Sequence, residues 1–145
     1  MQVVRRSVSA SAEAVFAVLA DGWSYTNWVV GASHIRAVDA GWPAPGARIH
    51  YCMGVWPFTV EDATTVVACE RPYLLELTAR LWPFGAAGIR FDLLETHAHR
   101  TEVRMTEHVI EGPARRTPSF AQALILHPRN AESLTRLCEI AERRG

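Results

Sequence analysis

The chain has 145 residues, of which 49% are hydrophobic and 21% charged, a balance typical of one globular domain and not of a disordered segment. Its 15 basic residues, all Arg, are balanced by 15 Asp and Glu. This balance argues against a nucleic-acid or anionic-membrane binder. Three widely spaced Cys without a CxxC pair predict neither a disulfide framework nor a zinc knuckle.

The hydropathy pattern also excludes a membrane-spanning protein. No apolar run approaches the roughly 18 residues that a spanning helix needs. The first residues, MQVVRRSVSAS, have no apolar core of the kind found in signal peptides. We therefore expect a soluble, cytoplasmic protein with one domain over residues 1–145.

The first part of the chain is predicted to form a strand and two short helices. Residues 2–9 are typical of a strand of moderate quality. Ser11 can cap a helix over 11–20, which Asp21 and Gly22 would end. A second short helix is expected near 23–29.

Six further strands are predicted after these helices, with short turns between most of them. The turns contain Pro and Gly, or polar residues, and connections this short favour antiparallel hairpins. The sheet is therefore expected to be a meander. The expected strands are 35–38, 48–53, 58–69, 73–82, 87–96 and 101–110.

The chain is predicted to close with one long amphipathic helix over 118–143. Apolar residues recur there at alternating spacings of four and three, which places them on one helix face. These residues are Phe120, Leu124, His127, Ala131, Leu134, Cys138 and Ala141. Pro128 lies inside this helix and is expected to kink it near 124–128.

Alternation along the strands predicts which side chains point inward. In 101–110 the apolar face contains Val103 and Met105 together with a carboxylate, Glu107. A carboxylate facing an apolar interior has a raised pKa unless it is paired, so Glu107 is the clearest acid/base or ligand-binding candidate. Strand 58–69 does not alternate cleanly, and a bulge there leaves the direction of Asp62 open.

The tripeptide Trp-Pro-Phe occurs in two turns that meander parity places at the same end of the sheet. The aromatic residues of these turns are Trp56, Phe58, Trp82 and Phe84. Two interpretations stay open: a lid over the mouth of a cavity, or aromatic turns that cover the end of the core.

The chain resembles the helix-grip superfamily of START domains and birch-pollen-allergen-like proteins, in its bacterial polyketide cyclase/dehydrase-like branch. The resemblance rests on the order of several segments: SASAEAVFAVLAD, DAGWPAPGARIHY, ERPYLLELTAR, TEVRMTEHVIEGPA and RNAESLTRLCEIAE. It implies an α+β fold in which a curved antiparallel sheet of seven strands holds a long C-terminal helix, with two short helices between the first two strands. It also implies a lipophilic cavity; members bind lipids, sterols, polyketides or hormones, and some catalyse reactions.

The candidate ligand-binding residues combine this implied cavity with the predicted faces. They are Trp28, Tyr51, Leu77, Phe91, Met105, Glu107, Leu124 and His127. Glu107, Tyr51 and His127 are also the candidates for acid/base catalysis. Tyr25 is a further candidate for a polar contact. His97 and His99 fall in a predicted hairpin turn without a third ligand, so we expect no metal and no cofactor.

Three functions from different classes remain open. The preferred hypothesis is a binding or carrier protein for a small hydrophobic ligand, as a monomer or homodimer. The second is an aromatase/cyclase-type enzyme that folds a polyketide-like chain and moves protons through the three candidates. The third is a protein-interaction module, which would show an exposed apolar patch and no enclosed volume.

Overall fold

The computed structural model describes residues 1–30, 32–53, 60–81 and 85–144. The seven strands are β1 (Gln2–Val8), β2 (Ala32–Val38), β3 (Arg48–Met53), β4 (Val60–Glu70), β5 (Leu74–Leu81), β6 (Gly85–His97) and β7 (Arg100–Glu111). The helices are α1 (Ala12–Ala20), α2 (Tyr25–Trp28) and α3 (Ser119–Arg144), with short 3₁₀ turns η1 (Gly22–Ser24) and η2 (Pro113–Arg116).

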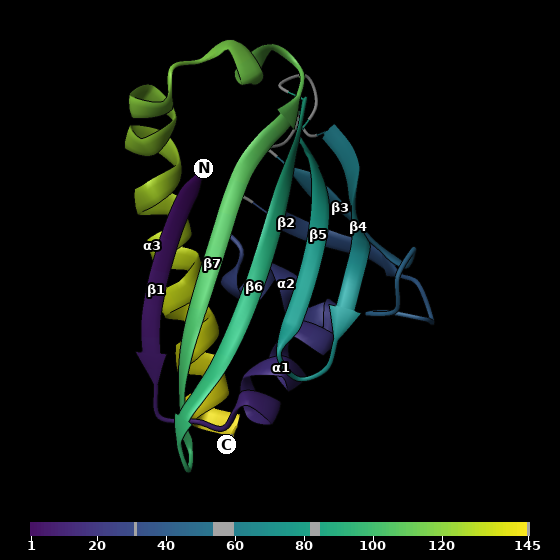
Figure 1. Cartoon of the computed structure of the whole chain (residues 1–145). Coiled ribbons are helices and arrows are strands. Elements are labelled where there is room, and N and C mark those ends of the chain that lie inside the picture. Colours follow the sequence, from purple (N-terminus) through teal and green to yellow (C-terminus); the bar gives the residue numbers. More distant parts are fainter. Residues whose placement is uncertain (31, 54–59, 82–84, 145) are drawn as a thin grey trace.

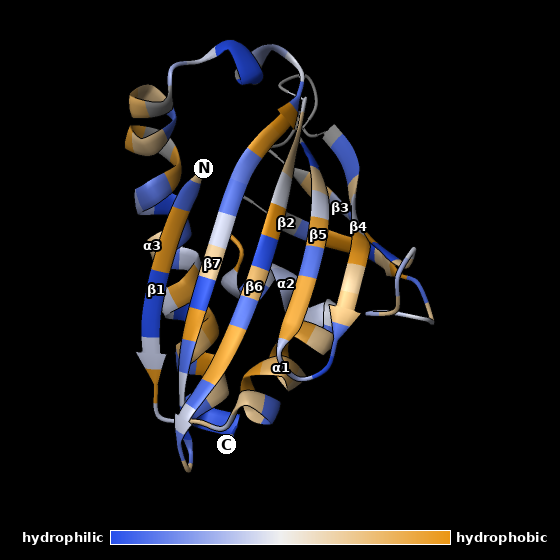
Figure 2. Cartoon of the chain, viewed as in Figure 1, coloured by the Kyte–Doolittle hydropathy of each residue, from blue (hydrophilic) through white to orange (hydrophobic). Residues whose placement is uncertain are grey.

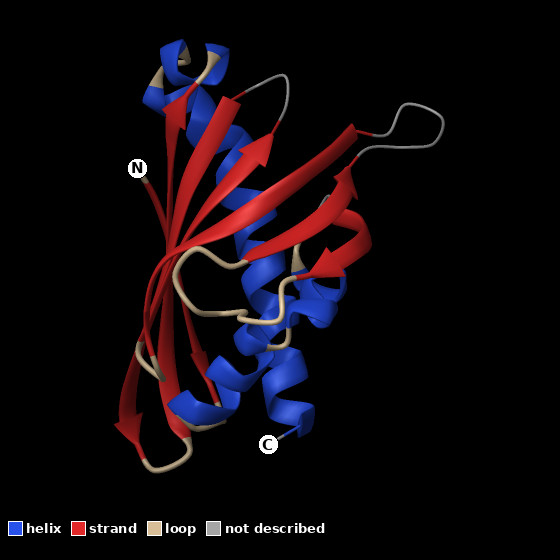
Figure 3. Cartoon of the chain, turned by 90° about the vertical axis from the view of Figure 1, so that its right-hand side faces the viewer, coloured by secondary structure: helices blue, strands red, loops and turns tan. Residues whose placement is uncertain are grey.

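The strands form one antiparallel sheet in the order β1-β7-β6-β5-β4-β3-β2. Strands β2 to β7 follow one another as a meander, and β1 joins the sheet beside β7. The sheet curves strongly around the helices, which all lie on its concave side (Figure 1, Figure 3). The predicted α+β architecture, a curved seven-stranded sheet around a long last helix, is confirmed.

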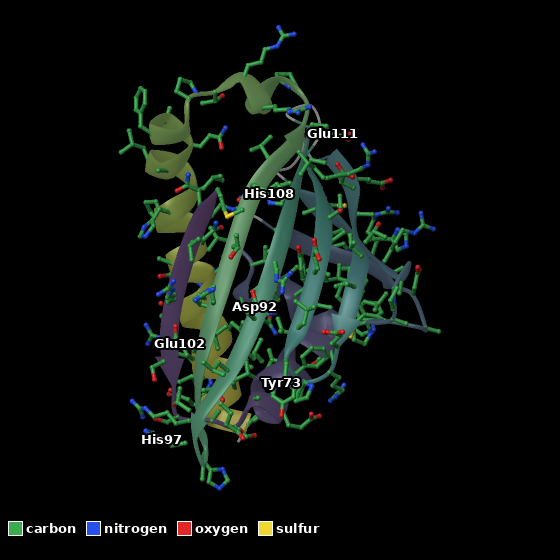
Figure 4. The ribbon with its side chains drawn as sticks, viewed as in Figure 1. Tyr73, Asp92, His97, Glu102, His108 and Glu111 are labelled. Carbon is green, nitrogen blue, oxygen red and sulfur yellow. The ribbon has the colours of Figure 1, made fainter. Side chains whose placement is uncertain are left out.

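The core lies between the concave face and the helices, and the alternation expected for 101–110 is correct. In β7 the side chains of Thr101, Val103 and Met105 are buried, and so is Glu107. The alternate residues on the other face of β7, from Glu102 to His108, are exposed or half-buried; Figure 4 labels Asp92, Glu102 and His108 on this outer face. In Figure 2 the strands accordingly alternate between hydrophobic and hydrophilic colours.

The direction of Asp62 is resolved by strand register. Asp62 lies directly opposite Tyr51 in the antiparallel β3–β4 pair, and directly opposite residues point to the same face. Since Tyr51 is buried, the half-buried Asp62 also belongs to the concave face. The irregularity suspected in this strand is present between Val66 and Ala68.

Helix α3 continues through Pro128 without ending there, so the proline does not split it. The second half of its predicted apolar face is buried as expected, with Leu134, Cys138 and Ala141 all in the core. The first half is not. The side chains of Phe120 and Leu124 are 72% and 74% exposed, and His127 is exposed as well.

Strand register explains why the first turns of α3 are exposed. β1 packs against α3, but β1 begins at Gln2, which lies opposite Glu107 of β7. Glu107 faces Arg129 of α3, with 3.7 Å between Oε1 and Nη1. The helix turns that precede Arg129 therefore extend past the N-terminal end of β1 (Figure 1).

In the described part of the chain, no helix is both long and apolar enough to cross a membrane.

Two glycines with positive φ differ in their surroundings and give a matched stability test. Gly85 has φ 118°, and an added Cβ would run into the backbone carbonyl of Glu111. Gly46 has φ 88°, but its Cβ would meet nothing within 4 Å. We expect Gly85→Ala to lower the free energy of unfolding by about 3 kcal/mol and Gly46→Ala by about 1 kcal/mol, measured by chemical denaturation. Equal losses would contradict the close approach at Gly85.

Candidate functional site

A small cavity lies between the concave face of the sheet and helices α2 and α3. Its volume is about 10 Å³, which is room for about one water molecule. Its lining is mainly apolar, with a polar group on the α3 side. The lining residues are Tyr25, Trp28, Val29, Leu77, Ile89, Phe91, Met105, Arg129, Asn130 and Ser133. The described side chains therefore fill nearly all of the space in which the family resemblance implies a lipophilic cavity.

A buried ionic group lies next to this cavity. Glu107 is 1% exposed, and the only ion pair that its carboxylate makes among the described residues is the 3.7 Å contact with Arg129. Arg129 also donates from Nε to the backbone carbonyl of Val30 at 3.2 Å, and Ser133 Oγ accepts from the Val30 amide at 3.0 Å. These two hydrogen bonds attach Val30, which follows shortly after the end of α2, to the middle of α3.

Several buried polar atoms at or next to this cavity have no hydrogen-bond partner among the described residues. They are Trp28 Nε1, both carboxylate oxygens of Glu107, and both amide atoms of Asn130. Buried polar side chains are nearly always satisfied, and each unsatisfied one costs about 1–3 kcal/mol. Their concentration around one cavity is therefore the most unusual polar feature of the interior.

Burial is the main influence on the protonation of Glu107. Loss of solvent raises the pKa of its carboxyl above the usual 4.5, because the charged form is destabilised in the interior. The Arg129 guanidinium opposes this shift, and Asn130 and His108 lower the pKa further. Asn130 is close enough for this effect, although no atom of the pair meets hydrogen-bond geometry.

A chain of hydroxyl groups forms a second polar feature on the β3–β4 side. Tyr51 Oη donates to the backbone carbonyl of Arg80 at 3.3 Å, so it accepts from Thr64 Oγ1 at 3.0 Å. Thr64 then has no proton left for Tyr25, so Tyr25 Oη donates to Thr64 at 3.2 Å. Burial raises the pKa of both tyrosines, so these hydroxyls stay protonated.

Four aromatic rings connect the two polar features. The ring of Tyr51 stacks on Tyr25 at 5.6 Å between centroids. Trp28 meets Tyr25 edge-on at 5.4 Å and Phe91 edge-on at 5.7 Å. No hydrogen bond of the indole adds to this packing among the described residues, because Trp28 Nε1 has no partner there.

No protein-family model matches the chain, and no curated protein matches it in sequence. Solved structures match it over nearly its whole length. Protein NE0264 from Nitrosomonas europaea is 15% identical with a TM-score of 0.71, covering 99% of this chain and 94% of that one. The Zhui aromatase/cyclase from Streptomyces sp. R1128 is 18% identical with a TM-score of 0.71 and the same coverage. The di-domain ARO/CYC StfQ from the steffimycin biosynthetic pathway is 14% identical with a TM-score of 0.72, covering 99% of this chain and 45% of StfQ.

At these identities the likeness shows the fold. The chain has the helix-grip fold. This agrees with the resemblance drawn from the order of the sequence segments, while the activity of the two aromatase/cyclases is a property of those proteins.

The predicted site residues fall into four groups. Trp28, Leu77, Phe91 and Met105 line the cavity. Tyr51 and Glu107 are buried close to it. Leu124 and His127 are exposed on α3 and do not line it, because the helix extends past β1 at that level. The four residues expected at a cavity mouth, Trp56, Phe58, Trp82 and Phe84, lie outside the described residues, and His97 and His99 are exposed at the β6–β7 hairpin.

The sequence interpretation missed three polar residues at the cavity, Arg129, Asn130 and Ser133, and two apolar ones, Val29 and Ile89. The apolar spacing that defined the inner face of α3 passed over polar residues. Asn130 precedes Leu134, Leu137 and Ala141 by four, seven and eleven positions, which is itself a helix-face pattern. A polar residue at the same helical spacing as these buried positions was the signal that could have identified Asn130 from the sequence.

The raised pKa of Glu107 gives a pH prediction. The folded state binds its proton more tightly than the unfolded chain, so the free energy of unfolding falls as pH rises from 4.5 through the raised pKa, by at most about 1.4 kcal/mol per pH unit. We expect Glu107→Gln to remove this decline in denaturant unfolding measured across that range. Glu102→Gln, on the opposite face of β7, is the control and should keep it. Parallel pH profiles for wild type and Glu107→Gln would contradict the prediction.

Proposed function

We propose that the chain binds a small, largely apolar molecule that presents one hydrogen-bonding group to Glu107, Asn130 and Trp28. The observation that supports this proposal is the set of unpartnered buried polar atoms beside an otherwise apolar cavity. A structural core gains little from such groups, because an apolar residue of similar shape fills the same space without an unsatisfied atom. A bound ligand would supply the missing hydrogen-bond partners.

The chemistry of the group narrows the ligand. Trp28 Nε1 can only donate, the Asn130 amide can donate and accept, and the Glu107 carboxyl accepts and also donates when it is protonated. Arg129 adds a positive charge 3.7 Å from Glu107. Donors therefore predominate, so the matching ligand group is an acceptor such as a ketone, an ester or a carboxylate. The apolar body of the ligand would contact Leu77, Phe91 and Met105.

The cavity must enlarge to admit such a molecule, since ligand pockets usually measure about 300–1,000 Å³. Trp28 is the residue whose movement would open it. Its ring fills the space between Tyr25 and Phe91, and it belongs to a helix of four residues followed by two hydrogen bonds to α3. In this proposal the ligand takes the place of the indole ring, and binding selects the open form.

Binding is preferred over catalysis because the acid/base candidates do not meet. Tyr51 is engaged with Thr64 and Arg80, Glu107 faces Arg129, and His127 is exposed. No hydrogen bond among the described residues joins any two of these three candidates. The fold shared with two aromatase/cyclases is compatible with either function.

Replacing Asn130 separates a ligand site from a structural water site. We expect Asn130→Leu to raise the free energy of unfolding by about 1 kcal/mol, because it removes two unsatisfied atoms. Ligand uptake from a mixture of fatty acids and hydroxylated aromatic polyketides, measured by native mass spectrometry, should fall at least about tenfold. Thr106→Val, on the outer face of β7, is the control for a polar-to-apolar change. If Asn130→Leu destabilises the protein and leaves uptake unchanged, Asn130 has a structural partner and the proposal is wrong.

Truncating Trp28 tests the opening step. Trp28→Ala should destabilise the protein by about 3–5 kcal/mol and bind naphthalene more tightly than wild type in calorimetry, because the probe no longer displaces the ring. Phe16→Ala is the matched control, since Phe16 is fully buried but does not line the cavity. Tighter binding by both variants would indicate general loosening of the core and would count against Trp28 as the moving residue.

A further inference from the structure

The end of the molecule formed by η2 and the first turns of α3 combines exposed apolar side chains with unpaired positive charge. We call this segment, residues 112–127, the basic tip. It lies at the opposite end from α1 and the C-terminus, beyond the start of β1 (Figure 1). We propose that the basic tip docks peripherally on an anionic lipid surface. This inference does not rest on the ligand site proposed above.

The apolar part of the tip is a single helix face. Phe120 and Leu124 are four residues apart, so they project from the same side of α3, and they are 72% and 74% exposed. Further along the helix this face becomes the buried stripe of Leu134 and Ala141. A face that is core in one half of a helix and exposed in the other is available to an apolar phase outside the protein.

The charge of the tip is uniformly positive. Residues 112–127 contain no Asp or Glu. Arg115 and Arg116 are exposed, and within the described part of the chain neither forms an ion pair. The preceding acid, Glu111, is engaged by Arg80 at 3.3 Å. The zero net charge of the whole chain, which argued against an anionic-membrane partner, therefore conceals a local excess of positive charge.

The space beside the arginines fits a lipid headgroup. A surface hollow of about 580 Å³ is bordered by Glu111, Gly112, Pro113, Arg115 and Arg116. Phe120 follows this hollow at the start of α3. Exposed Arg side chains next in the chain to an exposed Phe and Leu are the composition that binds in the interface of anionic membranes.

A membrane is favoured over a second copy of the chain for two reasons. A two-fold dimer through the tip would bring the Arg115–Arg116 pairs of both copies together. A stable protein interface also needs about 800 Å² from each partner, whereas the described side chains of the tip include two large exposed apolar ones. Binding to a lipid surface requires neither paired opposite charges on the protein nor a partner surface of matched shape.

The test is vesicle flotation of the full chain at low salt. We expect wild type to float with phosphatidylcholine vesicles that contain about 25 mol% phosphatidylglycerol, to stay behind with pure phosphatidylcholine, and to detach as salt is raised. The double variant Arg115→Gln/Arg116→Gln should bind the anionic vesicles about 30-fold more weakly. Phe120→Ser/Leu124→Ser should bind at least about tenfold more weakly.

Two control variants remove the same groups from another face. Arg5→Gln/Arg104→Gln changes the net charge equally, at two exposed arginines that lie opposite each other in β1 and β7. Leu94→Ser removes an apolar side chain that is 64% exposed on β6. Both should bind like wild type, and circular dichroism verifies that every variant folds. Failure of wild type to bind anionic vesicles, or equal losses in the outer-face controls, would overturn the proposal. Phe120-dependent dimerisation without vesicle binding would assign the tip to self-association instead.

Discussion

The burial of one stripe of α3 in the concave face of a single sheet is the interaction on which the rest of this structure depends. The sheet has one apolar face, and the helices on that side are what cover it. Leu134, Leu137 and Ala141 of α3 are at most 1% exposed, so this half of the helix is part of the core. Removing apolar area of this kind from water is the main favourable term in folding. The curvature of the sheet follows from the need to enclose that stripe.

How far this contact extends along α3 also determines where the ion pair, the small cavity and the exposed part of the helix lie. β1 begins at the level of Glu107 and Arg129, and the packing of this strand against the helix does not extend past that level. On the core side of this level the interior is filled and apolar. At the level itself lie the ion pair, Asn130 and the small cavity. Beyond it α3 continues with its apolar face exposed. The polar cluster therefore sits at the boundary of the core, where α2 is attached to α3 by the two hydrogen bonds of Val30.

The sequence predicted the fold and the strand faces well because both depend on local periodicity. Alternation along β7 was sufficient to place Glu107 in the interior, and short turns were sufficient to predict a meander. The exposure of Leu124 and His127 was not predictable in the same way. A helical repeat shows which residues share a face, but how far the partner strand reaches depends on the register of Gln2 against Glu107, a pairing between residues far apart in the chain. Asp62 illustrates the same limit, because a bulge later in β4 obscured the alternation that the β3 register resolves.

The polar residues of the site were harder to foresee for a different reason. Asn130 and Ser133 interrupt an apolar face, and a search for apolar periodicity treats such interruptions as noise. In a folded core they are the informative positions, since a buried amide without a partner is disfavoured by the stability of the fold itself. Solved structures with 14–18% identity share this fold over nearly the whole chain, so its shape tolerates wide change in sequence. A buried polar atom without a partner lowers the stability of the fold, so a partner from outside the fold would account for it. In the proposed function the unpartnered polar atoms of Glu107, Asn130 and Trp28, more than the cavity volume in the closed form, therefore mark where a ligand would bind.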